Sequence, residues 1–258
     1  GYFERLRDEK IRIAYKPQQV EHIPKQFSGS VKELLKKVDE KDAFDAVCKT
    51  LELTPILDRS ITDVSGGELQ RVAIAATVLK DANVYFFDEP TSYLDIKQRI
   101  KVSKFIQDLA DKDTAVVVIE HDLIILDYMT DLLHLMYGKE NAYGIVSQPK
   151  TTRNGINVYL KGFIPEENMR FRPSQITFDI RAPRELQNDV QVADWEAFDV
   201  SKGSFSLHAD AGTINAHDII GVLGENGIGK TTFVKELAKI EGETKKGELR
   251  ISHKPQYL

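Results

Sequence analysis

The sequence predicts an α/β fold, because two short apolar runs and one glycine-rich loop are arranged as in a parallel sheet. The runs at residues 84–87 and 115–119 are uninterrupted by polar side chains, which is typical of strands buried on both faces. Residues 95–110 between them have helical periodicity, so strand, helix and strand follow one another. A third apolar run, at 219–223, leads directly into a glycine-rich loop at 224–231. We therefore expect a second sheet, beginning near Trp195 and reaching this run.

Helices are expected on either side of these strands. Apolar spacing predicts helices at 32–38 and 43–53, and another from Gly66 to about Lys80. Ser65 is placed to cap the last of these at its amino end. A further helix is expected at 232–239, directly after the glycine-rich loop.

Composition excludes several classes of protein. The 258 residues are 41% hydrophobic and 29% charged, with no apolar run close to the roughly 20 residues of a membrane helix, so we expect no membrane partner. The amino terminus does not resemble a signal peptide. A single cysteine, Cys48, rules out an internal disulfide and a cysteine-only metal cluster, which fits a reducing, cytoplasmic location.

The net charge of −5 argues against a generally basic nucleic-acid coat, but one stretch is basic. Residues 150–184 hold seven basic and three acidic side chains, interleaved with aromatic residues. That mixture suits contact with phosphates and stacked bases. It equally suits a solvated hinge whose aromatic rings pack in a core, and composition leaves both open. The candidate RNA contacts are Arg153, Lys161, Arg170 and Arg172.

The loop at 224–231 has the pattern Gly-x4-Gly-Lys-Thr, between an apolar run and a helix-forming segment. Glycines let the backbone turn tightly and aim amide hydrogens at phosphates, while the helix amino terminus adds its positive end. Lys230 would neutralise the β and γ phosphates, and the Thr231 hydroxyl would ligate Mg²⁺. The candidate nucleotide-binding residues here are Gly224, Glu225, Asn226, Gly227, Ile228, Gly229, Lys230, Thr231 and Thr232.

Two further groups suit phosphate chemistry. Asp88 and Glu89 follow the apolar run at 84–87, and open α/β sheets bind their ligands at the carboxyl ends of strands. Asp88 suits holding Mg²⁺ through water, and Glu89 suits orienting or deprotonating an attacking water. Ser65, Gly66 and Gly67 offer a hydroxyl, unobstructed amides and a helix amino terminus, although alone they indicate only a helix cap.

One eight-residue phrase occurs twice. Residues 249–256 match residues 11–18 at five positions, which include Gln256 and Gln18. Lys230 precedes Gln256 by 26 residues, and the position 26 residues before Gln18 would fall ahead of Gly1. We therefore expect two tandem nucleotide-binding domains, both incomplete in this chain. Their predicted bounds are the carboxyl-terminal part of the first at 1–147, a hinge or linker at 148–190, and the amino-terminal part of the second at 191–258.

These groups together resemble the motifs of ATP-binding cassette proteins. Residues 64–70, 88–90 and 92–95, with His121, Gln18 and Gln256, resemble the signature, Walker B, D-loop, switch histidine and Q-loops. The resemblance implies a P-loop NTPase fold in which ATP is sandwiched between the Walker A loop of one domain and the signature of the other. Lys230 and Ser65 would then face the same nucleotide.

The same resemblance assigns further roles. Gln18 and Gln256 would contact Mg²⁺ or the nucleophilic water, and His121 would contact the γ-phosphate and steady Glu89. An aromatic residue that stacks on adenine is expected ahead of the Walker A loop, with Phe205 as the first choice and Phe198 as the second. A core role for either phenylalanine is the alternative.

Several short segments narrow the resemblance to the ABC-E family of ribosome-recycling factors, also called RNase L inhibitors. They are Tyr-Lys-Pro-Gln at 15–18, His-Lys-Pro-Gln at 253–256, and the segments 65–76, 92–95, 143–150, 152–157 and 171–173. The resemblance implies an ATPase that splits ribosomes after termination or rescue, beside a release factor or its rescue paralogue, and then stays on the small subunit. It also implies a hinge that contacts ribosomal RNA, which favours the RNA interpretation of the basic stretch. Iron–sulfur clusters are expected only in a domain absent from this chain.

On this interpretation ATP closes the cassettes, and hydrolysis reopens them, because ATP binds the closed state more tightly. Little hydrolysis is expected from these residues alone, since neither predicted domain holds both the phosphate loop and the acidic pair. The alternatives are a transporter motor, a DNA-repair cassette and a non-catalytic scaffold. The DNA-repair alternative is disfavoured because no coiled-coil heptads lie between Gln18 and Ser65, so no DNA partner is expected.

Overall fold

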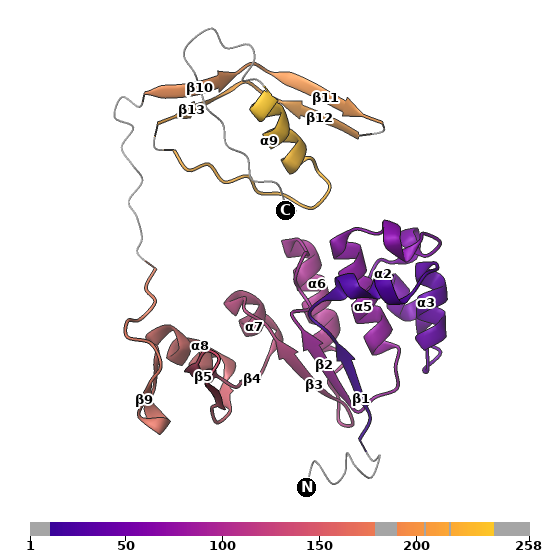
Figure 1. Cartoon of the computed structure of the whole chain (residues 1–258), viewed down its shortest axis with the longest axis vertical. Coiled ribbons are helices and arrows are strands. Elements are labelled where there is room, and N and C mark those ends of the chain that lie inside the picture. Colours follow the sequence, from indigo (N-terminus) through magenta and orange to yellow (C-terminus); the bar gives the residue numbers. More distant parts are fainter. Residues whose placement is uncertain (1–10, 179–189, 204, 217, 240–258) are drawn as a thin grey trace. The chain divides into compact units, whose positions relative to one another are not determined.

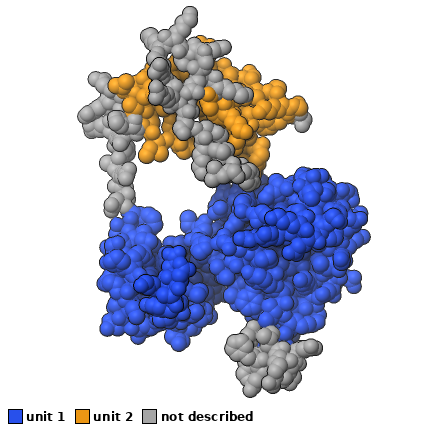
Figure 2. Space-filling view, viewed as in Figure 1, with its two compact units in different colours: residues 1–178 blue, residues 179–258 orange. Residues whose placement is uncertain are grey.

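The computed structural model describes residues 11–178, 190–203, 205–216 and 218–239 (Figure 1). The chain divides into two compact units, residues 1–178 and 179–258, which are coloured separately in Figure 2. This division falls inside the predicted hinge at 148–190, and the domain bounds proposed from the sequence stay a prediction. Gln256 and the second copy of the repeated phrase lie outside the described residues.

Unit 1 is built on a three-stranded parallel sheet in the order β1 (Ile13–Lys16), β2 (Val84–Asp88) and β3 (Ala115–Ile119). Tyr85 of the central strand pairs with Ala14 on one side and Val116 on the other. The two apolar runs predicted as parallel strands are therefore confirmed, and the α/β fold class with them.

The two faces of this sheet differ in burial. Lys16, Tyr85 and Phe87 are at most 1% exposed on the face that packs against the core, where α5 (Gly66–Val78) contacts β1 and β2. On the other face Val117 and Ile119 are 44% and 50% exposed. The expectation that both strands are buried on both faces is wrong: β2 is buried on one face and half-buried on the other, and β3 is half-buried on one face and exposed on the other.

Helix α5 lies at the centre of unit 1. Ser65 caps it in a capping box with Glu68, and eight of its 13 residues are buried. Contacts from α3 (Val31–Val38) and α4 (Phe44–Thr50) on α5 complete the core. The remaining short helices here are η1 (Val20–His22), α2 (Ile23–Gln26), η2 (Thr54–Ile56) and η3 (Ile61–Asp63).

Two helices follow the sheet strands. α6 (Ile96–Gln107) begins after Asp95, whose carboxylate accepts from the Gln98 amide, and α7 (Leu123–Met129) begins after Asp122. The helices contact each other, and Arg99 pairs with Asp122 at 3.1 Å. The predicted helices at 32–38, 43–53, 66–80 and 95–110 are all present; the first begins one residue earlier than predicted, and the other three are shorter.

The rest of unit 1 is a small folded region around Leu135, Val158 and Ile164. Its central helix α8 contacts α7, so the first part of the segment predicted as a linker is a folded part of unit 1. Its elements are β4 (Leu132–Leu133), β5 (Met136–Lys139), β6 (Tyr143–Val146), β7 (Lys150–Thr151), α8 (Thr152–Lys161), β8 (Phe163–Ile164), η4 (Pro165–Glu167) and β9 (Met169–Arg170).

Unit 2 has two antiparallel strand pairs and one described helix. β10 (Gln191–Trp195) pairs with β13 (Gly212–Asn215), and β11 (Phe198–Lys202) pairs with β12 (Phe205–Ala209). Helix α9 (Lys230–Lys239) contains the predicted helix at 232–239 and begins two residues earlier. No helix within the described ranges is long and apolar enough to cross a membrane.

One expectation for unit 2 is wrong. The apolar run at 219–223 is not a strand, and Ile219 and Leu223 are 95% and 94% exposed. A strand exists through its hydrogen bonds to a neighbouring strand, and no described segment pairs with this run.

Candidate nucleotide-binding and catalytic site

Glu89 follows the last residue of β2 and is fixed to the neighbouring strand. Its amide donates to the Ile119 carbonyl at 2.9 Å, and its φ of +46° lies in the left-handed region that non-glycine residues seldom adopt. The Ser92 hydroxyl donates to Glu89 Oε2 at 3.1 Å. The sharp turn after the sheet therefore aims this carboxylate in a fixed direction.

Two of the residues predicted from the sequence converge on Glu89. Gln18 Nε2 donates to Glu89 Oε1 at 2.7 Å, and His121 Nε2 lies 3.0 Å from the same oxygen. The His121 side chain is 81% exposed, whereas that of Glu89 is only 19% exposed. The sheet thus brings an amide, an imidazole and a carboxylate from three strand ends to one point.

A buried lysine contacts the backbone that carries Glu89. Lys16 is fully buried, and its Nζ donates to the Asp88 carbonyl at 2.7 Å and to the Glu89 carbonyl at 3.3 Å. Burial lowers the pKa of Lys16 to about 8, although the nearby carboxylates of Asp88, Glu89 and others oppose that shift. From the helix side, Gln70 Nε2 donates to the Glu89 carbonyl at 2.7 Å.

The segment after Glu89 is tied to the end of β3. The amide and hydroxyl of Thr91 both donate to Glu120 Oε1, at 3.0 and 2.7 Å. Asp88 accepts a hydrogen bond from the Tyr15 hydroxyl at 3.1 Å. These bonds fix the backbone that carries the acidic pair.

The Ser65–Gly66–Gly67 turn has the geometry of a helix cap. Ser65 Oγ accepts from the Glu68 amide at 3.3 Å, and Glu68 Oε2 accepts from the Ser65 amide at 2.7 Å. A Cβ on Gly67 would lie 3.1 Å from the carbonyl oxygen of Tyr93, so the predicted D-loop packs closely against this turn. A larger residue at this position would have to displace the Tyr93 backbone by a few tenths of an ångström.

In unit 2 the conformation of the glycine-rich loop is set by residues of the loop itself. Gly227 and Gly229 have φ of +83° and +100°, in the region that favours glycine. Lys230 is the first residue of α9, and its Nζ donates to the carbonyls of Gly224 at 2.7 Å and Glu225 at 2.5 Å. The loop therefore curls around the ammonium group, with Thr231 and Thr232 in the first turn of the helix. The remaining loop positions, Asn226 and Ile228, directly precede Gly227 and Gly229.

The structure separates the two candidates for adenine stacking. Phe205 lies against the loop, since a Cβ on Gly229 would be 2.7 Å from Phe205 Cζ. Phe198 instead stacks on Phe233 of α9, with ring centroids 6.1 Å apart. Phe205 therefore keeps its place as the first choice, and its role stays a prediction.

The predicted RNA contacts differ in their surroundings. The Arg172 guanidinium lies 5.0 Å from the Tyr159 ring centroid and 5.6 Å from that of Phe171, and Arg170 lies over Phe163. Arg153 is within 3.6 Å of Asp127 but remains 89% exposed. Lys161 is exposed at the end of α8. Several of these aromatic faces are thus covered by arginines of the same unit.

The donor atoms suit magnesium. Mg²⁺ takes oxygen ligands, keeps several waters and is usually held by one or two carboxylates together with substrate phosphates. Asp88, Gln18 and Thr231 supply oxygens of that kind. Within the described ranges no three His, Cys, Asp or Glu side chains are grouped as a metal site.

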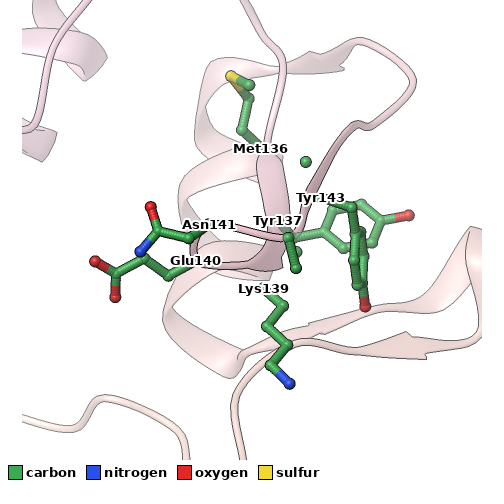
Figure 3. A pocket seen from close by; sticks show the side chains of 9 residues that line it. Met136, Tyr137, Lys139, Glu140, Asn141 and Tyr143 are labelled. Carbon is green, nitrogen blue, oxygen red and sulfur yellow. The ribbon is translucent and has the colours of Figure 1, made fainter.

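A surface hollow elsewhere has no link with this chemistry. Figure 3 shows it lined by residues 136–144, all from the β5–β6 hairpin of unit 1. None of the site residues predicted from the sequence lies in it, and we assign it no ligand.

The sheet, its strand-end carboxylates and the capped Ser-Gly-Gly helix define an ATP-binding cassette protein. Residues 3–92 match the family model described as ABC transporter. An "uncharacterized ABC transporter ATP-binding protein" of Methanocaldococcus jannaschii is 50% identical over 262 residues, covering 100% of this chain and 43% of that protein. The chain thus spans less than half the length of this relative.

Two solved structures are similar to this chain at nearly the same sequence identity. An archaeal ribosome recycling factor, aABCE1, crystallised with the ribosomal stalk protein aP1, superposes with a TM-score of 0.85 at 48% identity, over 100% of this chain and 50% of that one. The ABCE1 chain in a model of ribosome-bound archaeal Pelota and ABCE1 gives 0.90 at 49% identity, over 100% and 44%. The chain belongs to the E family of ATP-binding cassette proteins, the RNase L inhibitors. The resemblance inferred from the sequence is confirmed.

Four residues whose hydrogen bonds hold the backbone around the acidic pair were not predicted from the sequence. Lys16 and Gln70 lie within recognised motifs, but no role was assigned to either. Thr91 and Glu120 are also absent from the predicted set. No strand was predicted at 13–16, so nothing in the sequence signalled that Lys16 would be buried beside the acidic pair.

Proposed function

We propose that this chain forms the central part of a twin-cassette ATPase that separates ribosomal subunits. The observation that carries the catalytic part is the convergence of Gln18 and His121 on Glu89 Oε1, at 2.7 and 3.0 Å. The ribosomal part is supported by relatives whose names include ribosome recycling factor and ribosome-bound ABCE1.

Glu89 would act as the general base. A water oxygen attacks the γ-phosphorus, the bond from that phosphorus to the bridging oxygen breaks, and the water proton passes to Glu89. Gln18 and His121 hold the carboxylate in position, and His121 is exposed enough to reach the γ-phosphate. Mg²⁺ would neutralise phosphate charge at each nucleotide; Asp88 and Gln18 would hold it in the first domain, and Thr231 would hold it in the second.

A second nucleotide site would include the glycine-rich loop, because the loop and Glu89 belong to different predicted domains. Lys230 would exchange its two carbonyl acceptors for phosphate oxygens, and Ser65 at a helix amino terminus would contact the γ-phosphate of a sandwiched nucleotide. Tighter binding of ATP to the closed cassettes would make closure favourable, and hydrolysis would reverse it.

The partners we propose are the small ribosomal subunit with its RNA and a release factor or its rescue paralogue, in the cytoplasm. Arg153 and Lys161 are exposed, and we favour these two basic side chains for RNA contact. Arg170 and Arg172 would have to leave their aromatic partners, so we expect a smaller role for them.

A chimera tests this proposal. In it this chain replaces the matching segment of the Methanocaldococcus jannaschii relative, which restores full length. We expect ATP-dependent separation of ribosomes into subunits on a sucrose gradient, retention on small subunits with a non-hydrolysable analogue, and loss of turnover with Glu89→Gln. Indifference to ribosomes together with co-purification with membranes would instead favour a transporter motor.

A further inference from the structure

Glu89 is held in a strained backbone conformation by contacts on its carbonyl oxygen. At φ +46° the residue is in a region that costs conformational energy and persists only where the surroundings enforce it. Its carbonyl accepts from Gln70 Nε2 at 2.7 Å, from Lys16 Nζ at 3.3 Å and from the Ser92 amide at 3.4 Å. Two of these three donors are side chains from other elements.

Lys16 reaches this carbonyl from β1. The residue is fully buried, and its ammonium also donates to the Asp88 carbonyl at 2.7 Å. The two acceptors belong to successive residues, so the ammonium bridges the carbonyls on either side of the Glu89 α-carbon. A buried charge is costly unless it is bonded, and here that bonding fixes the backbone of the acidic pair.

Gln70 reaches the same carbonyl from α5. It is fully buried, and among the described residues its Oε1 has no hydrogen-bond partner. A buried amide oxygen without a partner destabilises the fold, and a leucine of similar size would avoid that cost. Core stability alone therefore gives no reason for glutamine here, whereas the bond from Nε2 to Glu89 does.

We propose that Lys16 and Gln70 are positioning residues that together clamp the Glu89 carbonyl. By fixing the left-handed turn, they aim the Glu89 carboxylate at Gln18 and His121. The catalytic meaning of this clamp rests on the function proposed above for Glu89, while its structural part stands by itself.

Matched variants separate the clamp from ordinary core packing. Lys16→Met and Gln70→Leu keep the approximate shape and remove the donors. Two controls also remove a buried hydroxyl that donates to a backbone carbonyl nearby: Tyr85→Phe on β2, whose hydroxyl donates to the Lys80 carbonyl, and Thr77→Val on α5, whose hydroxyl donates to the Ala73 carbonyl. Gln70→Met also removes the donor and has an unbranched side chain of similar length, for use if Gln70→Leu fails to fold.

The first readout is the backbone of Glu89 in this chain. NMR shifts and the amide-to-α-proton coupling of Glu89 should leave their left-handed values in Lys16→Met and Gln70→Leu, and stay unchanged in both controls. The second readout is ATP turnover by the chimera. We expect kcat to fall by about 10-fold or more in the clamp variants with the KM for ATP changed by less than about 2-fold, because misplacing a catalytic group slows the chemical step.

The outcomes are distinguishable. If Glu89 keeps its left-handed signature and kcat stays at the parent value in both clamp variants, the clamp does not exist. If Glu89→Gln leaves turnover intact, the proposed function of Glu89 is wrong, and the NMR readout still decides whether Lys16 and Gln70 hold the turn. Equal losses of kcat in Tyr85→Phe and Thr77→Val would assign the effect to core packing and overturn the proposal.

Discussion

An apolar run that leads directly into a functional loop occurs in each unit, and the two runs fold differently. β2 (Val84–Asp88) pairs with a strand on both sides, and Phe87 at its end is fully buried. The run at 219–223 pairs with no described strand, and Leu223 is 94% exposed. Hydrophobicity makes a segment able to form a buried strand, but neighbouring strands decide whether it does.

This difference extends to the chemistry that follows each run. Glu89 is fixed by bonds from β1, β3 and α5, so its position depends on the core of unit 1. The glycine-rich loop is shaped by its own positive φ angles and by Lys230. The acidic site should therefore respond to changes in the core, and the loop to changes in its glycines.

The largest expected effect comes from the core of unit 1. Phe87→Ala should lower the free energy of unfolding of unit 1 by about 3–5 kcal/mol, because a fully buried ring leaves a cavity. Leu223→Ala should change that of unit 2 by less than about 0.5 kcal/mol. Urea unfolding followed by circular dichroism reports mainly the helices of unit 1, and fluorescence of Trp195, the single tryptophan, reports unit 2. A cost for Leu223→Ala as large as that for Phe87→Ala would show that the run at 219–223 is buried.

The next effect concerns the glycine-rich loop. Gly229→Ala should destabilise unit 2 by about 1–3 kcal/mol, since alanine strains at φ +100° and its Cβ would lie 2.7 Å from Phe205. Gly221→Ala is the matched control, with no heavy atom within 4 Å of an added Cβ. Unfolding followed by Trp195 fluorescence measures both variants. Equal behaviour of the two would contradict the loop conformation.

A smaller effect is expected at the cap of α5. Ser65→Ala should cost unit 1 about 1 kcal/mol through loss of the hydrogen bond to the Glu68 amide. Ser30→Ala at the start of α3 removes the same kind of capping box and should cost a similar amount. Circular dichroism in urea gives both values. A cost at Ser65 several times that at Ser30 would mean that Ser65 does more than cap its helix in the free chain.

The smallest effect is a pH dependence confined to unit 2. Hydrogen bonding to Asp199, its charge and a second bond to Asp210 raise the pKa of His208 above the usual 6.5. The resulting stabilisation is fully present below that usual pKa and is lost as pH rises through the folded value. Trp195 fluorescence in urea should show this loss, and Asp199→Asn should reduce it. An NMR titration that finds His208 at or below its usual pKa would contradict the contact.

Much of unit 1 was predictable because its signals are local. The runs at 84–87 and 115–119 became β2 and β3, and Ser65 became the cap of α5, as their side chains indicated. Glu89, Gln18 and His121 were recognised from motifs, and parallel strands bring their carboxyl ends to one edge, which is where these residues meet. The supporting contacts of Lys16 and Gln70 were not predictable, since each joins residues at least 19 positions apart.

The sequence by itself determined the family, the α/β class and the chemical groups at the strand ends. These follow from residue type and spacing, which the chain carries whether folded or not. Only the tertiary structure decided that the described helices leave one sheet face open at β3, that no described strand pairs with the run at 219–223, and that Phe205 rather than Phe198 lies against the glycine-rich loop. Each of these depends on which distant segment comes to lie beside a residue, and that depends on the packing of the whole unit.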